Sequence, residues 1–183
     1  MTKHFINAET QLAESFRLAA LVHASGYRPE LILGVWRGGA PIAIAVHEYF
    51  AFRGHCCEHL PVRVSSYTGI DEQAGQIAIH GLPGLIAELA CHQRLLIVDD
   101  VVDSGRSLTA LLAALRSDGA DRELRTACPW YKPEHSRTGL VPDYHLHQTD
   151  AWLVFPHELT GLDRDEIRTG KGRLAPLLLD PSA

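Results

Sequence analysis

The sequence is short of the features that mark secreted, membrane-bound or disulfide-stabilised proteins. It has only 4 cysteines among 183 residues, and the adjacent Cys56 and Cys57 are poorly placed to pair with each other, so we expect reduced thiols. No run of about 18 or more apolar residues occurs, and the opening residues lack the apolar core of a signal peptide. We therefore expect a cytoplasmic protein with no membrane partner.

A strong excess of either charge is also missing. The chain has 17 basic and 22 acidic residues, a formal net charge of -5 and a pI near 6.1. Binding to nucleic acid needs a basic face or stripe, which this balance does not supply, so we expect no nucleic-acid partner. A local anion pocket remains compatible with it. With 46% hydrophobic residues, the chain is long enough for a single domain over residues 1–183 with a sizeable core.

One short string combines the side chains that commonly bind zinc, namely His55, Cys56, Cys57, Glu58 and His59. No second cluster follows at the spacing of a zinc finger. We therefore favour a polar loop between a helix and a strand that begins near Leu60, with the thiols turned partly inward.

Helix-like and strand-like segments alternate along the chain. Asn7 and Gly26 are suitable start and stop residues for a first helix. Apolar spacing then predicts strands over 31–36, 61–67, 77–79, 94–100 and 123–128, and helices over 40–53 and 107–118. The order favours an α/β fold with a mainly parallel central sheet flanked by helices, in which ligands bind beyond the carboxyl ends of the strands.

The pattern changes after the last of these strands. From Pro129 to Pro156 the chain is richer in proline, histidine, tryptophan and tyrosine and has only short strand-like pieces. We expect a small hood subdomain there, formed mainly by about 129–160. From Gly161 onward the sequence predicts no particular element.

The most informative stretch is residues 95–108, which read LLIVDDVVDSGRSL. Asp99 and Asp100 end an apolar strand, and a turn then leads directly into a helix. A helix start offers unpaired N–H groups to a phosphate, and the turn residues Ser104, Gly105 and Ser107 add hydroxyl donors and room for close approach. Carboxylates beside a phosphate site suit sugar hydroxyls, or a Mg²⁺ ion shared with the phosphates of a substrate.

This stretch resembles the phosphoribosyl diphosphate (PRPP) signature of the type I phosphoribosyltransferases. The resemblance implies that Asp99 and Asp100 bind the ribose hydroxyls, with Asp100 also contacting Mg²⁺. It implies that Asp103 faces N7 of a purine as the general acid/base. The loop residues Ser104, Gly105, Arg106 and Ser107 would hold the 5′-phosphate.

Further matches point to the xanthine-guanine and hypoxanthine branch of that family. Arg37, Gly38 and Gly39 are similar to its pyrophosphate loop, and Ser66 and Tyr67 resemble the start of its flexible lid. Lys132, in the string WYKP, stands where the branch has a lysine that contacts the 6-oxygen of the purine, as suits an ammonium donor. Trp152 and Leu153 resemble the segment that stacks on the base and reads its edge.

The sequence also departs from the family pattern. Arg106 stands where the loop usually has a small residue, and is either an extra phosphate ligand or exposed to solvent. Gln73 lies near the place where many relatives carry a basic lid residue, so a weaker hold on pyrophosphate is implied. The histidines at 145, 147 and 157 match no family motif and are expected on the surface or in packing.

The resemblance therefore implies a magnesium-dependent enzyme that transfers phosphoribosyl from PRPP to guanine, xanthine or hypoxanthine in purine salvage. Its partners would be PRPP and the base, and the family commonly forms dimers or tetramers. Two alternatives stay open. One is a regulator that senses PRPP or a nucleotide with the same fold, and the other is a phosphoribosyltransferase for another base.

Overall fold

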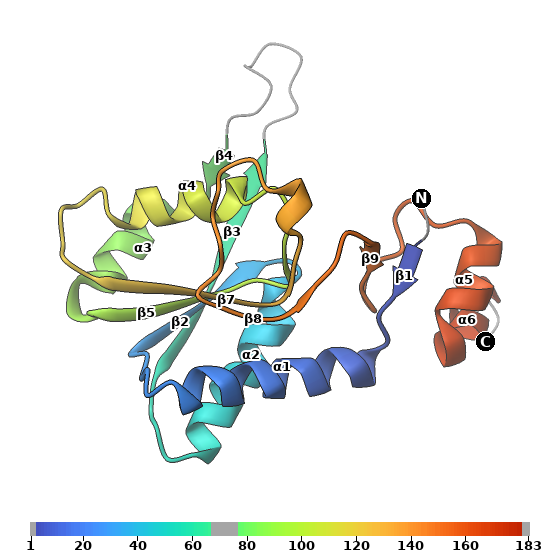
Figure 1. Ribbon diagram of the computed structural model, residues 1–183, viewed down its shortest axis with the longest axis horizontal. Helices are drawn as coiled ribbons and strands as arrows, with labels where there is room; N and C mark the ends of the chain where they lie inside the picture. Colours follow the sequence, from blue (N-terminus) through green and yellow to red (C-terminus); the bar gives the residue numbers. More distant parts are fainter. Residues whose placement is uncertain (1–2, 67–76, 181–183) are drawn as a thin grey trace, which may run out of the picture. The chain divides into compact units, whose positions relative to one another are not determined.

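The computed structural model describes residues 3–66 and 77–180, which form an α/β fold with a mainly parallel central sheet, as the alternating pattern predicts (Figure 1). The order of the strands is β4-β3-β2-β5-β7-β6, with β8 also paired to β7; among the described strands, β3 and β4 are antiparallel and the other pairs are parallel. The strands are β2 (Leu31–Trp36), β3 (Glu58–Ser66), β4 (Ile77–Ile79), β5 (Arg94–Val98), β6 (Val101–Val102), β7 (Glu123–Tyr131) and β8 (Tyr144–Gln148).

Helices cover both faces of this sheet. Figure 1 shows α1 (Ala8–Ala24) and α2 (Gly39–Phe52) on one side, with α3 (Leu82–Glu88) and α4 (Arg106–Leu115) on the other. Alternate residues of a strand point to opposite faces, so Leu31 and Leu33 pack with α4 while Ile32 packs with α1 and α2. Strand β5 divides in the same way, which explains why it is apolar at every buried position.

The boundaries of the first helix follow from local chemistry. The Asn7 side chain accepts a hydrogen bond from the Thr10 backbone N–H at 2.7 Å, which satisfies one of the unpaired donors at a helix start. The helix ends at Ala24, and Gly26 then adopts φ +86°, a conformation that glycine tolerates without strain. Both terminal residues expected from the sequence are confirmed.

Strand β7 is longer than its pattern predicts, because Pro129 does not end it. β7 pairs with β5 as far as Ala127 and with the short strand β6 from Trp130 onward. The proline, which lacks a backbone N–H, therefore falls where the strand changes partner and costs little there. The prediction that this strand ends at Cys128 is wrong for that reason, and helix α3 was not expected at all.

The described residues group into two compact units, one comprising 14–150 and the other 3–13 with 151–180. In the smaller unit, β1 (Lys3–Phe5) pairs in parallel with β9 (Trp152–Val154). It also contains α5 (Arg164–Gly170) and α6 (Ala175–Leu179), and Asp163 and Glu166 form a reciprocal capping box at the start of α5. A hood formed mainly by about 129–160 stays a prediction.

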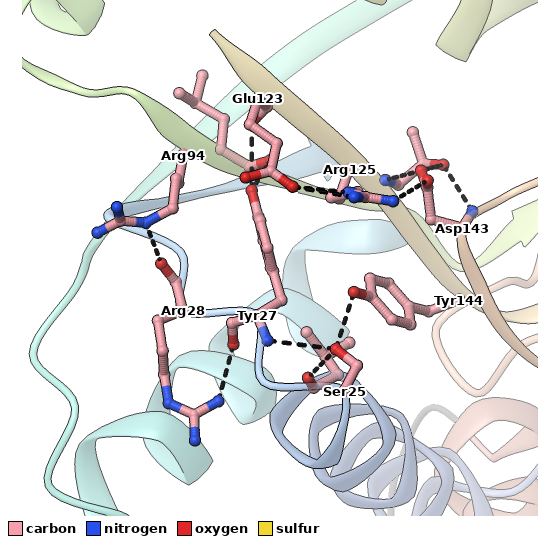
Figure 2. A network of polar contacts seen from close by, with 11 residues as sticks. Ser25, Tyr27, Arg28, Arg94, Glu123, Arg125, Asp143 and Tyr144 are labelled. Atoms are coloured by element: carbon pink, nitrogen blue, oxygen red, sulfur yellow. Dashed lines mark hydrogen bonds and ion pairs between the residues drawn. The ribbon is translucent and has the colours of Figure 1, made fainter.

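A polar network joins the amino ends of β5 and β7 to the turn after α1 (Figure 2). The buried Tyr27 hydroxyl donates to the carbonyl oxygens of Leu95 at 3.0 Å and Glu123 at 3.2 Å. Arg125 bonds Glu123 and Asp143 beside it. These groups pair with one another at the edge where the strands begin, opposite the edge that carries Asp99 and Asp100.

The expectations about thiols and metals can be compared with the described residues. All four cysteines are free, and within residues 3–66 and 77–180 no group of three or more His, Cys, Asp or Glu side chains is placed to hold a metal. Across the same ranges no helix is long and apolar enough to cross a membrane. The zinc-like string spans the end of the loop before β3 and the first residues of that strand, which begins at Glu58 and not near Leu60. In the loop, His55 contacts the Pro29 carbonyl oxygen at 2.6 Å.

Two isoleucines of α2 offer a test of the packing. Ile42 is fully buried against the sheet and Ile44 is 53% exposed on the same helix. We expect Ile42→Ala to lower the free energy of unfolding by about 2–5 kcal/mol, because a cavity remains in the core. The matched change Ile44→Ala should cost less than about 1 kcal/mol. Urea unfolding of both variants measures the difference, and equal losses would contradict the packing.

Candidate active site

Three strand ends meet at the carboxyl edge of the sheet and carry the polar groups that the sequence singled out. β2 and β5 are parallel neighbours with Gly34 beside Val98, so the turn after Trp36 and the two carboxylates after Val98 lie at the same edge. β6 follows directly and leads to Asp103. The fold therefore brings the Arg37–Gly39 turn and the acidic residues together.

Two glycines make close approach between these segments possible. A Cβ atom on Gly38 would overlap the Asp100 carboxylate, and one on Gly39 would lie 2.8 Å from the Asp99 Cα. Any larger residue would force the turn or the acids to move. The peptide bond between Trp36 and Arg37 is cis, and the Arg37 side chain is exposed. The turn thus packs its backbone against the carboxylates and leaves its guanidinium in solvent.

Asp99 and Asp100 are adjacent carboxylates at the end of the buried strand. The Asp99 side chain accepts the Asp100 backbone N–H at 2.9 Å, and the Asp100 side chain accepts the Val101 N–H at 2.8 Å. Loss of hydration and then the neighbouring charge of Asp100 raise the pKa of Asp99 well above its usual range. Bound hydroxyl donors or a cation would offset that repulsion.

The turn after β6 forms a cradle at the start of α4. Gly105 adopts φ +76° immediately before the helix, and the first N–H groups of α4 follow it. Ser104 and Ser107 are half-buried, whereas Arg106 is exposed. A Cβ on Gly105 would collide with the Thr138 side chain, so a later segment packs closely against this turn.

Strand register brings Asp103 to Lys132. Val102 lies beside Tyr131 in the β6–β7 pair, so the residues that follow each strand are neighbours. The Lys132 ammonium donates to Asp103 Oδ2 at 3.0 Å, and its side chain is only 6% exposed. An ammonium and a carboxylate of this kind can serve a carbonyl acceptor and a ring N–H of one heterocycle.

His135 completes this cluster and was missed by the sequence interpretation. Its Nδ1 lies 3.1 Å from Asp103 Oδ1, so both carboxylate oxygens have a partner. Partial burial of Asp103 works to raise the pKa, but the hydrogen bonds and charges of Lys132 and His135 outweigh it and lower the pKa below its usual value. The one signal available was its position three residues after Lys132, within the segment that was expected to form the hood.

The residues predicted for the lid and for base stacking belong to segments other than those around Asp103. Ser66 ends β3, beside Ile77 of β4, while Tyr67 and Gln73 lie outside the described residues. Trp152, 54% exposed, and Leu153, which is buried, are neighbours in β9 of the smaller unit. His147 is exposed and contacts Glu14 at 2.8 Å, and the half-buried His145 contacts Gln148; both were expected on the surface or in packing.

Comparison with known proteins identifies the family. Residues 6–159 match the model of the phosphoribosyl transferase domain. The hypoxanthine-guanine phosphoribosyltransferase of Lactococcus lactis subsp. lactis (strain IL1403) is 30% identical over 143 residues, which is 74% of this chain and 68% of that protein. The chain belongs to the phosphoribosyl transferase family.

Solved structures agree with that assignment. The purine phosphoribosyltransferase from Pyrococcus horikoshii Ot3 is 29% identical, with a TM-score of 0.67 over 89% of this chain and 99% of that one. The Helicobacter pylori xanthine-guanine-hypoxanthine phosphoribosyltransferase shares the fold at 23% identity, with a TM-score of 0.66 over 84% and 90% of the two chains. The protein is a phosphoribosyltransferase similar to the purine enzymes, which confirms the resemblance read from residues 95–108.

The close packing of Gly38 on Asp100 can be tested by adding one methyl group. We expect Gly38→Ala to lower the free energy of unfolding by about 1–3 kcal/mol, because the new Cβ has no room. Gly84 in α3 has nothing within 4 Å of the same atom, so Gly84→Ala should be neutral or raise stability by up to about 1 kcal/mol. Thermal unfolding compares the two, and identical midpoints would argue against the contact.

Proposed function

We propose that the protein transfers the 5-phosphoribosyl group of PRPP to a 6-oxopurine, namely guanine, xanthine or hypoxanthine, and releases pyrophosphate in purine salvage. The observation that carries the choice of base is the Lys132–Asp103 contact at the carboxyl edge of the sheet. An ammonium can donate to a 6-oxygen, whereas the amino group of adenine would present a donor to a donor. Asp103 beside it suits the N–H at position 7 of the same ring.

The PRPP half of the proposed site uses the remaining edge residues. Ser104, Gly105 and Ser107 would hold the 5′-phosphate at the start of α4, with Arg106 near enough in sequence to add a charge. Asp99 and Asp100 would accept hydrogen bonds from the ribose hydroxyls. The turn of Arg37, Gly38 and Gly39 would bind the leaving pyrophosphate, and Ser66 and Tyr67 would begin the lid.

Magnesium fits the donor set at this edge. The protein offers Asp99 and Asp100, a pair of oxygen ligands with an unfavourable charge between them, and Mg²⁺ commonly takes one or two carboxylates while substrate phosphates complete its shell. When bound, the ion would neutralise charge on the diphosphate leaving group. We assign the protein contact to Asp100.

The chain's own contribution to the reaction would then be positional. Transfer creates positive charge on the ribose, so the acidic pair stabilises the sugar while the glycine turn orients the leaving group. Asp103 would take the proton from the purine ring as the new bond to the ribose forms. Trp152 and Leu153 would stack on the base and read its edge, within a hood of about 129–160.

The location, oligomeric state and partners of the protein are also part of the proposal. We infer a cytoplasmic enzyme that works as a dimer or tetramer and has no nucleic-acid partner. The absence of a strong basic excess supports the last point.

A panel of bases tests the proposal. Purified protein is incubated with Mg²⁺, PRPP and one of guanine, xanthine, hypoxanthine, adenine or uracil, and pyrophosphate release is measured. Release with one or more 6-oxopurines and not with adenine or uracil is expected. Release with another base alone would overturn the choice of substrate. PRPP binding without release for any base would instead favour a sensor.

Asp103→Asn tests the acid/base role. The amide cannot take the proton, so we expect kcat to fall by about 10²–10⁴-fold while the affinity for PRPP changes much less. Asp121, an exposed carboxylate in the turn before β7, is the matched control, and Asp121→Asn should keep kcat. A variant at Asp103 with unchanged turnover would remove that residue from the chemistry.

A further inference from the structure

The segment that follows β7 is fixed to the Asp103 turn on both sides. The Lys132 backbone N–H donates to the Val102 carbonyl oxygen at 2.9 Å, and the Arg137 N–H donates to the Ser104 carbonyl oxygen at 3.0 Å. Asp103 therefore lies between two backbone anchors. Within the segment, His135 belongs to a short 3₁₀ turn that begins at Pro133, whose ring restricts its backbone. The backbone, and not a mobile loop, aims the imidazole at Asp103.

The two partners of the Asp103 carboxylate differ in what else they can do. Lys132 bonds Oδ2 and is the group proposed to contact the 6-oxygen of the base, so that bond is given up or shared when substrate binds. His135 bonds Oδ1 through Nδ1, and the proposed function gives it no contact with the base. Of the two, His135 is the partner that Asp103 can keep through the reaction.

We propose that His135 is a positioning residue for Asp103: it holds Oδ1 so that Oδ2 is presented to the purine when Lys132 turns to the 6-oxygen. This inference rests on the proposed function. With its proton on Nδ1, the His135 ring donates to Oδ1, and the carboxylate stays ionised and in one orientation. The ring N7–H bond of the base then breaks, and its proton goes to Oδ2. The electron pair returns to the ring as N9 bonds the ribose carbon, and pyrophosphate leaves with the electrons of the old bond.

The groups that set the charge of Asp103 come from two directions. Lys132 at the end of β7 and His135 on the 3₁₀ turn contact the carboxylate, and both lower its pKa against the opposing effect of burial. Glu134 and Arg137 on the same segment are exposed to solvent. Removal of His135 therefore takes away a donor that favours the ionised carboxylate, and the pKa of Asp103 should rise.

The test replaces His135 in two ways. His135→Phe removes the donor, and we expect kcat to fall by about 10-fold, part of the 10²–10⁴-fold typical of acid/base catalysis. The acidic limb of the pH profile of kcat/KM should move to higher pH, because protonation now inactivates Asp103 sooner. The KM for PRPP should stay within about twofold, since the phosphate cradle is untouched. His135→Asn, whose amide can donate from a similar position, should restore most of the loss.

Controls separate this role from a structural one. His145→Phe changes a histidine of β8 that contacts Gln148 and Tyr131, and should leave the pH profile in place. In an Asp103→Asn background, His135→Phe should cause no further loss, because the two residues act as a unit. An undiminished second loss, or an unmoved acidic limb in His135→Phe, overturns the proposal. His135→Ala serves the same comparison where the phenylalanine variant folds poorly.

A readout independent of activity distinguishes failure of this inference from failure of the proposed function. The pKa of the Asp103 carboxyl is measured by NMR titration in the wild-type chain, His135→Phe and His135→Asn. A higher value in the phenylalanine variant alone supports the contact, and equal values in all three overturn it. If no base yields pyrophosphate but that difference is found, the proposed function fails while the contact between His135 and Asp103 stands.

Discussion

The site depends on a change of partner along one strand. β7 leaves β5 near Pro129 and continues beside β6, and this step places Tyr131 next to Val102. Without it, Lys132 would not lie beside Asp103, and the buried ammonium would have no carboxylate at 3.0 Å. A charged group that is 6% exposed needs such a partner, so the pairing of β6 with β7 and the ion pair support each other.

The three aspartates at the carboxyl edge of the sheet have different electrostatic surroundings. Burial and the neighbouring charge of Asp100 raise the pKa of Asp99 at the end of an apolar strand. Three residues after Asp100, the hydrogen bonds and charges of Lys132 and His135 lower the pKa of Asp103. A cation or hydroxyl donors would therefore stabilise the charged form of Asp99, whereas Asp103 already has two hydrogen-bond partners. Carboxylates in such different surroundings suit different roles in one reaction.

Much of the fold could be predicted because its signals are local. The strand 94–98 alternates between two buried faces, Asn7 caps a helix, and Gly105 has the positive φ that a turn into a helix requires. The end of β7 was predicted wrongly because of Pro129. Sequence shows that a proline cannot donate a hydrogen bond between strands, but it does not show which strand lies beside it at that point. The capping box of Asp163 and Glu166 carried a readable pattern that was overlooked.

In the candidate site, too, residues close together in sequence could be predicted and residues brought together by the fold could not. Asp99, Asp100 and the phosphate turn follow one another in the chain, so their spacing alone brings them together. Asp103 and His135 are separated by 32 residues, and their contact follows from strand register and from two backbone hydrogen bonds that bracket the turn. A histidine at this position carries no sequence signal of its own, because the position of its segment depends on the pairing of β7 with β6. Residues that adjust a catalytic group from a later segment are the part of a site that sequence patterns are least able to reveal.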